Sequence, residues 1–189
     1  TAGKLATSLD MQNITLKGGT NNAITVDSSG IVDLPNTKIY ALFRNTTNVT
    51  SGGNITAWEV PDTGITAANI GDTFTHSSGV WTFPRTGVYR VIGNAGVRNT
   101  SGDSLTAAVL QTTSDSGSNY VTIAYQACGS NDTTNEDGNL YLEVLVNITN
   151  TTTQKIQMGA TSVGGSSIVY GDSTYNRTTI SFEWMATTQ

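Results

Sequence analysis

Apolar side chains recur at every second position through much of this chain, most plainly towards its C-terminus. Segment 140–146 has Leu or Val at each even position, and segment 179–184 alternates apolar with polar residues throughout. Successive side chains of a strand point to opposite faces, so a period of two predicts strands with one buried face. No stretch has a clean helical period. The chain is therefore predicted to be all-β.

Turn residues divide the rest of the chain into further short segments of the same kind. The additional strands predicted in this way cover residues 39–44, 55–60, 73–75, 80–83, 88–95, 105–112, 120–127, 156–160 and 168–170. Many short strands with closely spaced turn signals are typical of an antiparallel sandwich or barrel.

Composition supports this reading and excludes several classes of protein. Thr, Ser, Asn and Gly fill nearly half of the 189 positions; Thr favours extended backbone and Asn and Gly favour turns, which argues against a helical bundle. A net charge of −5, with apolar residues throughout, argues against a disordered chain. The 9 basic residues form no cluster and are outnumbered by 14 acidic residues, so nucleic acid is not an expected partner.

No apolar run approaches the length of a membrane span, and the start of the chain lacks the pattern of a signal peptide, so we expect a soluble chain without membrane insertion. Cys128 is the single cysteine, so it cannot form an intrachain disulfide. We expect stability to come from packing and from contacts with other subunits.

Residues 1–37 differ from the rest. Three short apolar pairs, in segments 14–16, 24–26 and 32–34, are separated by turn residues, and Pro35 follows the last of them. Strands this short cannot build a core alone, so we expect this segment to need copies of itself or a larger assembly. The chain is accordingly predicted to consist of a β-rich stalk or attachment segment, 1–37, and a head domain, 38–189.

Residues suited to catalysis are few. A Ser/His/Asp triad would require folding to bring partners to His76, the single histidine, and the segment 76–79 is interpreted more simply as a turn. Cys128 is interpreted as a small buried hydrophobe, and no Cys/His set could hold zinc. Glu59, Glu143 and Glu183 lie on different predicted strands; their convergence would be needed for a polysaccharide hydrolase. We predict a protein that is not an enzyme and assign no catalytic residue.

The acidic loop 131–139 is the best candidate for a metal site because calcium prefers carboxylate and amide oxygens. It departs from the EF-hand order, with Thr133 in place of the first Asp and Val144 in place of the bidentate Glu. A solvated hairpin loop is the favoured interpretation, and calcium remains an open alternative. No metal or cofactor is predicted.

Polar loops near Tyr120, Tyr170 and Tyr175 leave carbohydrate binding open, although tyrosines on strands also pack across subunit interfaces. No binding residue is assigned. Asn-x-Ser/Thr sequons, which carry glycans only in a secreted protein, follow from the high Asn and Thr content; they lie at Asn13, Asn45, Asn48, Asn54, Asn99, Asn131, Asn147, Asn150 and Asn176.

The run from Thr73 to Val91 resembles the tumour necrosis factor-like jelly rolls, in particular the complement-type globular heads. The residues that carry the resemblance are Trp81, Phe83, Pro84, Gly87 and Tyr89. Segments 39–43 and 55–60 look like the family's first two strands, and 179–184 resembles its closing strand, although Glu183-Trp184 replaces the usual small residues. The resemblance implies a jelly-roll head that assembles as a homotrimer; another antiparallel sandwich remains the alternative.

The stretch 24–35 resembles the attachment segments of bacteriophage fibre and capsid-surface proteins. With the head, it predicts a non-enzymatic virion structural protein: a trimeric fibre head or capsid decoration at the virion surface, serving host attachment or particle stabilisation. The expected partners are copies of itself, other virion proteins through the N-terminal segment, and a host surface glycan or protein receptor. The alternative is a secreted cytokine-like or lectin-like trimeric ligand, which would carry glycans on its sequons.

Overall fold

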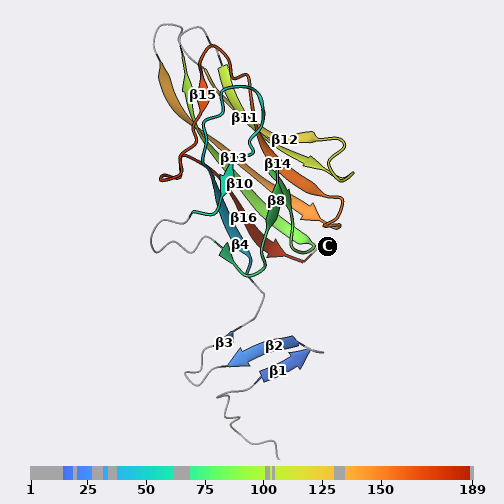
Figure 1. Cartoon of the computed structure of the whole chain (residues 1–189). Coiled ribbons are helices and arrows are strands. Elements are labelled where there is room, and N and C mark those ends of the chain that lie inside the picture. The colour runs from blue at the N-terminus through green and yellow to red at the C-terminus, as the bar shows by residue number, and fades with distance from the viewer. Residues whose placement is uncertain are drawn as a thin grey trace, which may run out of the picture. The chain divides into compact units, whose positions relative to one another are not determined.

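The computed structural model describes residues 15–18, 21–26, 32–33, 38–61, 69–100, 103, 105–129 and 135–187. The chain divides into two compact units, Thr1–Lys38 and Ile39–Gln189 (Figure 1). The first unit contains an antiparallel sheet in the order β1 (Thr15–Gly18), β2 (Asn21–Val26) and β3 (Val32–Asp33). These strands overlap the three predicted apolar pairs. That the segment needs partners remains a prediction.

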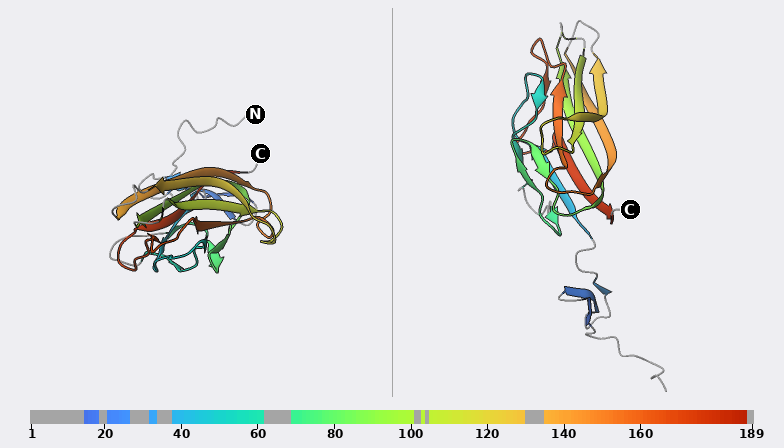
Figure 2. Two further views of the ribbon diagram at one scale, coloured as in Figure 1. Left: turned by 90° about the horizontal axis from the view of Figure 1, so that it is seen from above. Right: turned by 90° about the vertical axis from the view of Figure 1, so that its right-hand side faces the viewer.

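The second unit is a sandwich of two antiparallel sheets (Figure 2). The first sheet has the order β13 (Glu136–Ile148), β10 (Gly87–Asn99), β16 (Thr178–Ala186), β4 (Tyr40–Asn45) and β6 (Trp58–Glu59), with β15 (Ile168–Val169) beside β10 and β7 (Asn69–Ile70) beside β4.

The second sheet has the order β12 (Val121–Gly129), β11 (Leu105–Thr113), β14 (Lys155–Thr161), β9 (Val80–Thr82) and β8 (Thr75–Ser77), with β5 (Gly53–Asn54) beside β14. Neighbouring strands are mostly distant in sequence, so the chain crosses repeatedly between the sheets, as in a jelly roll. The described residues include no helix that is long and apolar enough to cross a membrane.

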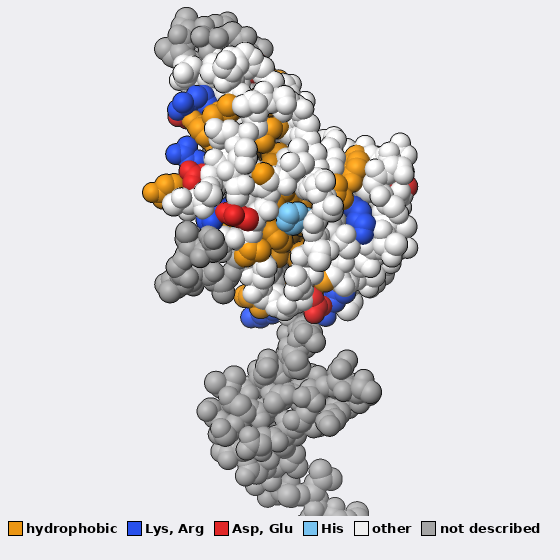
Figure 3. Space-filling view, viewed as in Figure 1, with side chains coloured by type: hydrophobic (Ala, Val, Ile, Leu, Met, Phe, Trp, Pro, Cys, Tyr) orange, Lys and Arg blue, Asp and Glu red, His pale blue; other side chains and the backbone are white. Residues whose placement is uncertain are grey.

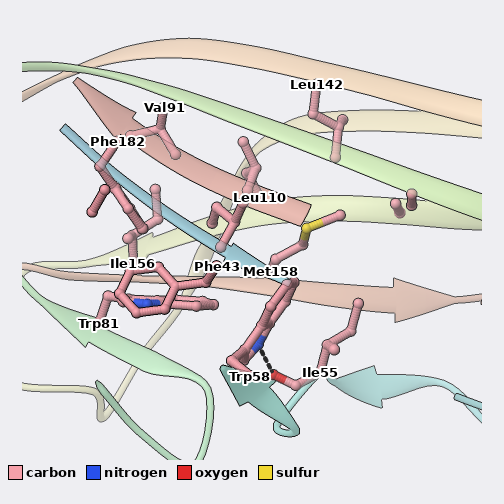
Figure 4. Packing of buried hydrophobic residues seen from close by; sticks show 14 of the residues in the cluster. Phe43, Ile55, Trp58, Trp81, Val91, Leu110, Leu142, Ile156, Met158 and Phe182 are labelled. Atoms are coloured by element: carbon pink, nitrogen blue, oxygen red, sulfur yellow. Dashed lines mark hydrogen bonds between the residues drawn. The ribbon is translucent and has the colours of Figure 1, made fainter. Parts of the chain in front are cut away.

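The core lies between the two sheets and is rich in aromatic rings (Figure 4). Along β10 buried and partly exposed residues alternate over the whole strand, which confirms the predicted period of two. Phe182 of the first sheet stacks on Phe74 with ring centroids 4.6 Å apart, and lies 5.5 Å from Trp81 of the second sheet. Such rings bury large apolar areas, so they dominate the energy that holds the sheets together.

The predicted strand–turn–strand unit between Trp81 and Tyr89 is present. Gly87 has a φ of 149°, and a Cβ there would lie 2.1 Å from the Trp184 Nε1, so the position requires glycine. The Tyr89 hydroxyl donates a hydrogen bond to the Arg85 carbonyl at 2.8 Å, which ties the strand back to the turn. Burial raises the pKa of Tyr89 to about 12.

One predicted strand, 55–60, is wrong in its extent. Only Trp58 and Glu59 form a strand there, and Gly53–Asn54 forms another in the opposite sheet. Ile55 and Trp58, three residues apart, are both buried, and the Trp58 indole donates a hydrogen bond to the Ile55 carbonyl at 2.6 Å (Figure 4). This contact curls the backbone where the chain passes between sheets, so the alternation is interrupted.

Candidate subunit interface

The outward side of the first sheet is formed by the side chains that alternate with the core residues of β4, β10, β13 and β16. We call this surface the β10–β13 face. Across the strands, Leu145, Arg90, Glu183 and Tyr40 are register neighbours and form one row. A second row contains Glu143, Ile92, Ser181 and Leu42. Antiparallel pairing therefore places residues from four distant segments side by side.

Large apolar side chains are exposed on this face. Tyr141 is 47% exposed, Leu145 67% and Met185 52%. The neighbouring apolar side chains Tyr40, Leu42, Val88 and Ile92 are only partly buried. Isolated exposed apolar residues are ordinary, but a group of them on one sheet face indicates a surface that contacts another protein.

The charges in the middle of the face are paired. The Arg90 guanidinium donates a hydrogen bond to Glu143 at 2.6 Å and lies 3.8 Å from a Glu183 oxygen. Glu143 also accepts a hydrogen bond from the Tyr141 hydroxyl. The hydrogen bond from Arg90 is the main reason that the pKa of Glu143 lies below its ordinary value. Pairing of this kind lowers the cost of taking these charges out of water.

A second charged network lies at one end of the face. Arg98 donates two hydrogen bonds to the Asp137 carboxylate, at 2.8 and 3.1 Å, and the Tyr170 hydroxyl donates a third at 2.7 Å. The Arg177 guanidinium lies 4.8 Å from the centre of the Tyr170 ring. The hydrogen bonds from Arg98 and then Tyr170 lower the pKa of Asp137 to about 2.

Two of the three glutamates considered for hydrolysis come together, because Glu143 and Glu183 both lie beside Arg90. Glu59 instead pairs with Arg44, at 2.6 Å. All three carboxylates therefore have an arginine partner. A general acid needs an environment that raises its pKa, whereas the hydrogen bond from Arg90 lowers the pKa of Glu143.

His76 and Cys128 take structural positions. The His76 ring lies edge-on to Phe43, with centroids 5.6 Å apart, and 5.7 Å from Trp81, and burial lowers its pKa. Cys128 packs against the hydrophobic core, as predicted for a small hydrophobe. A Cβ on Gly138 would lie 2.7 Å from the Cys128 sulfur, so this close packing depends on glycine.

The candidate calcium loop lies partly outside the described residues, which exclude 131–134. The described remainder begins β13, and its Asp137 carboxylate is occupied by Arg98 and Tyr170. No group of three or more His, Cys, Asp or Glu side chains suited to a metal is found in the described part of the chain. Calcium binding by this loop remains a prediction.

Of the three tyrosines considered for sugar binding, Tyr170 belongs to the Asp137 network, Tyr120 is partly buried near Gly117, and Tyr175 is exposed. The exposed apolar group of the β10–β13 face was not predicted from the sequence. The sequence did contain a signal for it. Tyr141 and Leu145 point to the side of β13 opposite to the side that carries Leu140, Leu142, Val144 and Val146. A strand that is apolar on both faces is expected to be buried on both.

No family model and no curated protein matches this chain. Solved structures do. The Eiger TNF from S. frugiperda aligns with a TM-score of 0.55 at 16% identity, over 80% of this chain and 95% of that one. Murine APRIL, crystallised at pH 5.0, aligns with a TM-score of 0.59 at 7% identity, over 79% of this chain and all of the other. The chain thus has the tumour necrosis factor-like jelly-roll fold that the motif predicted.

Proposed function

We propose that this protein is a non-enzymatic virion structural protein whose head associates as a homotrimer. In this proposal it is a fibre head or capsid-surface protein that mediates host attachment or stabilises the particle. The N-terminal segment connects it to other virion proteins.

The observation that carries the proposal is the β10–β13 face. It combines the outward side of one sheet, three exposed large apolar side chains and charges that are already paired. Apolar area of this kind is stabilised when a second surface covers it, because water is released from both. Closed symmetry would cover it on every copy and leave no open end.

The attachment role rests on the separate N-terminal unit and on the surface chemistry. On the face of the head shown in Figure 3, uncharged side chains cover most of the surface, and the charged ones gather mainly along one edge and at the lower end. A weakly charged surface rich in Thr, Ser and Asn suits contact and durability, since few side chains can carry out chemistry. The assignment to a virion is drawn from the resemblance of segment 24–35 to phage attachment segments.

Sedimentation velocity of the full chain at about micromolar concentration tests the association, since stable homo-oligomers have affinities in or below this range. We expect a single species with three times the mass of one chain. A stable monomer would overturn the proposed trimer. Labelling of source particles with an antibody against the head tests the location, and particles that remain unlabelled would overturn the virion role.

A secreted trimeric ligand is the second candidate, favoured by the similarity of fold to the Eiger TNF and APRIL structures. It predicts glycans on the natural protein. Asn45 and Asn99 are buried, so only exposed sequons such as Asn48, Asn150 and Asn176 could carry them. Intact mass of the natural protein distinguishes the two candidates, because the virion protein of a phage has the mass of the bare chain.

A further inference from the structure

The outward side of the second sheet carries a groove that the proposed interface does not use. It has a volume of about 490 Å³ and lies over β11, β12, β14 and β5. Its size falls within the range of about 300–1,000 Å³ seen for small-molecule sites. We call it the Tyr125 groove.

Strand register brings its residues together. Thr122, Gln111 and Gln157 are neighbours across β12, β11 and β14 and form one row of polar side chains. In the next row Tyr125 pairs with Val109, and Val109 pairs with Gly159. The groove is therefore built on three long paired strands, so its side chains have fixed positions before any ligand binds.

The polar row is internally aligned. The Gln157 amide donates a hydrogen bond to the Gln111 carbonyl oxygen at 2.8 Å, and the Gln111 amide donates to the Thr122 hydroxyl at 3.3 Å. These two hydrogen bonds fix which end of the Gln111 side chain donates and which end accepts. A primary amide has two N–H groups and a carbonyl oxygen, so Gln157 and Thr122 keep capacity to donate and accept further hydrogen bonds.

The second row offers apolar contact and a stretch of backbone without a side chain, which we call the floor of the groove. The Tyr125 side chain is 55% exposed. Gly159 leaves the floor without a side chain, and a Cβ there would come within 3.1 Å of the Gly53 carbonyl oxygen and 3.2 Å of a Val109 methyl group. A ligand can thus lie against a ring on one side and close to backbone on another.

Charge decides the class of ligand. All ten lining residues are Gly, Ala, Val, Asn, Gln, Thr or Tyr, so none carries a formal charge. A phosphate, sulfate or carboxylate would lose water without gaining a partner of opposite charge. A neutral pyranose ring has an apolar C–H face for Tyr125 and hydroxyls that match amides and threonine hydroxyls.

We propose that the Tyr125 groove binds a neutral saccharide. The inference deepens the attachment function proposed above and rests on it for its biological role. The groove lies on the sheet opposite to the β10–β13 face, so binding requires one head and no trimer interface.

The test uses the full chain and a panel of neutral oligosaccharides of glucose, galactose, mannose, rhamnose and N-acetylglucosamine, with sulfated and sialylated counterparts. Saturation-transfer NMR identifies a binder, and titration measures its affinity. We expect at least one neutral member to bind with a Kd in or below about the millimolar range. Tyr125→Ala is expected to weaken binding at least about tenfold, because it removes the aromatic contact.

Tyr175→Ala is the matched control, since this tyrosine is 66% exposed and lies outside the groove. It should leave the affinity unchanged. Gln157→Leu is a second groove variant that removes the amide but preserves side-chain volume, and it should also weaken binding. Thermal melts of each variant show whether the head remains folded.

Three results would overturn the proposal. The first is that no neutral saccharide binds at a concentration of about 10 mM, and the second is that only anionic glycans bind. The third is an unchanged affinity in a folded Tyr125→Ala variant. Sedimentation of the same samples separates the two proposals. A monomer that binds sugar contradicts the trimer and keeps the groove, and a trimer that binds none contradicts the groove alone.

Discussion

The two sheets of the head have similar inward faces and very different outward faces. Inward, both supply apolar and aromatic side chains to one core. Outward, the first sheet presents the β10–β13 face, with exposed Tyr141 and Leu145 around paired charges. The second presents the uncharged Tyr125 groove, where amides and a hydroxyl align beside one exposed ring.

The difference shows that one alternating pattern supports two kinds of surface. A face with exposed apolar side chains and internally paired charges loses little when it leaves water, so it favours permanent association. A concave face whose amides and hydroxyl keep spare donors and acceptors retains water until a polar ligand replaces it. We therefore expect substitutions on the two faces to have separable effects, one on assembly and the other on ligand binding.

The largest effect is expected for Leu145→Lys. It places a charge beside Arg90 at the centre of the β10–β13 face, and every copy in a trimer would bury it. Like charges at an interface cost several kcal/mol, so sedimentation should shift from trimer to monomer.

Val121→Lys is the matched control, because Val121 is 64% exposed and lies on β12 of the second sheet, outside the β10–β13 face. This variant should sediment as the unmodified protein does. If both variants dissociate, or neither does, the β10–β13 face is not the interface.

A smaller effect is expected for Gly159→Ala in the Tyr125 groove. The added methyl group meets the Gly53 carbonyl and Val109 at just over 3 Å, so the head should lose about 1 kcal/mol of stability. Saccharide affinity should fall because the floor is filled, while sedimentation stays unchanged. Denaturant unfolding and titration measure the two quantities. Unaltered affinity would show that ligand does not approach this floor.

The smallest effect is expected from acid. The pKa of Asp137 is about 2 in the folded head, below the unfolded value of about 3.9, so its stabilisation is present above about pH 4 and is lost as pH falls through 2. Carboxyl chemical shifts measured by NMR should give a midpoint near 2 for Asp137, and Asp137→Asn should reduce the loss of stability in acid. Arg98, Tyr170 and Arg177 surround this group. A midpoint near 4 would contradict the network.

Much of the fold was predictable because side-chain alternation and turn residues indicated the same strands. The period of two located β10, β11, β13 and β16 to within a few residues, and the Trp81 to Tyr89 motif indicated the correct jelly roll. The strand at 55–60 was mispredicted because a side-chain contact, Trp58 to the Ile55 carbonyl, overrode the alternation. The two residues are only three apart, but Trp58 also packs against Trp81 of the opposite sheet, with ring centroids 5.0 Å apart, and that packing is not visible in the local pattern.

The candidate sites were less predictable. Glu143, Glu183 and Arg90 are 40 or more residues apart in pairs, and only strand register makes them neighbours. Tyr125 was one of several tyrosines until pairing placed Gln111, Gln157 and Gly159 beside it.

The sequence by itself determined the all-β class, the segmentation into short strands and the identity of the central motif. These follow from side-chain periodicity and turn chemistry, which act between near neighbours. Only the tertiary structure decided which outward face is apolar and which is a polar groove. Sheet order and register join residues that are distant in the chain, and those pairings are set by how the whole core closes.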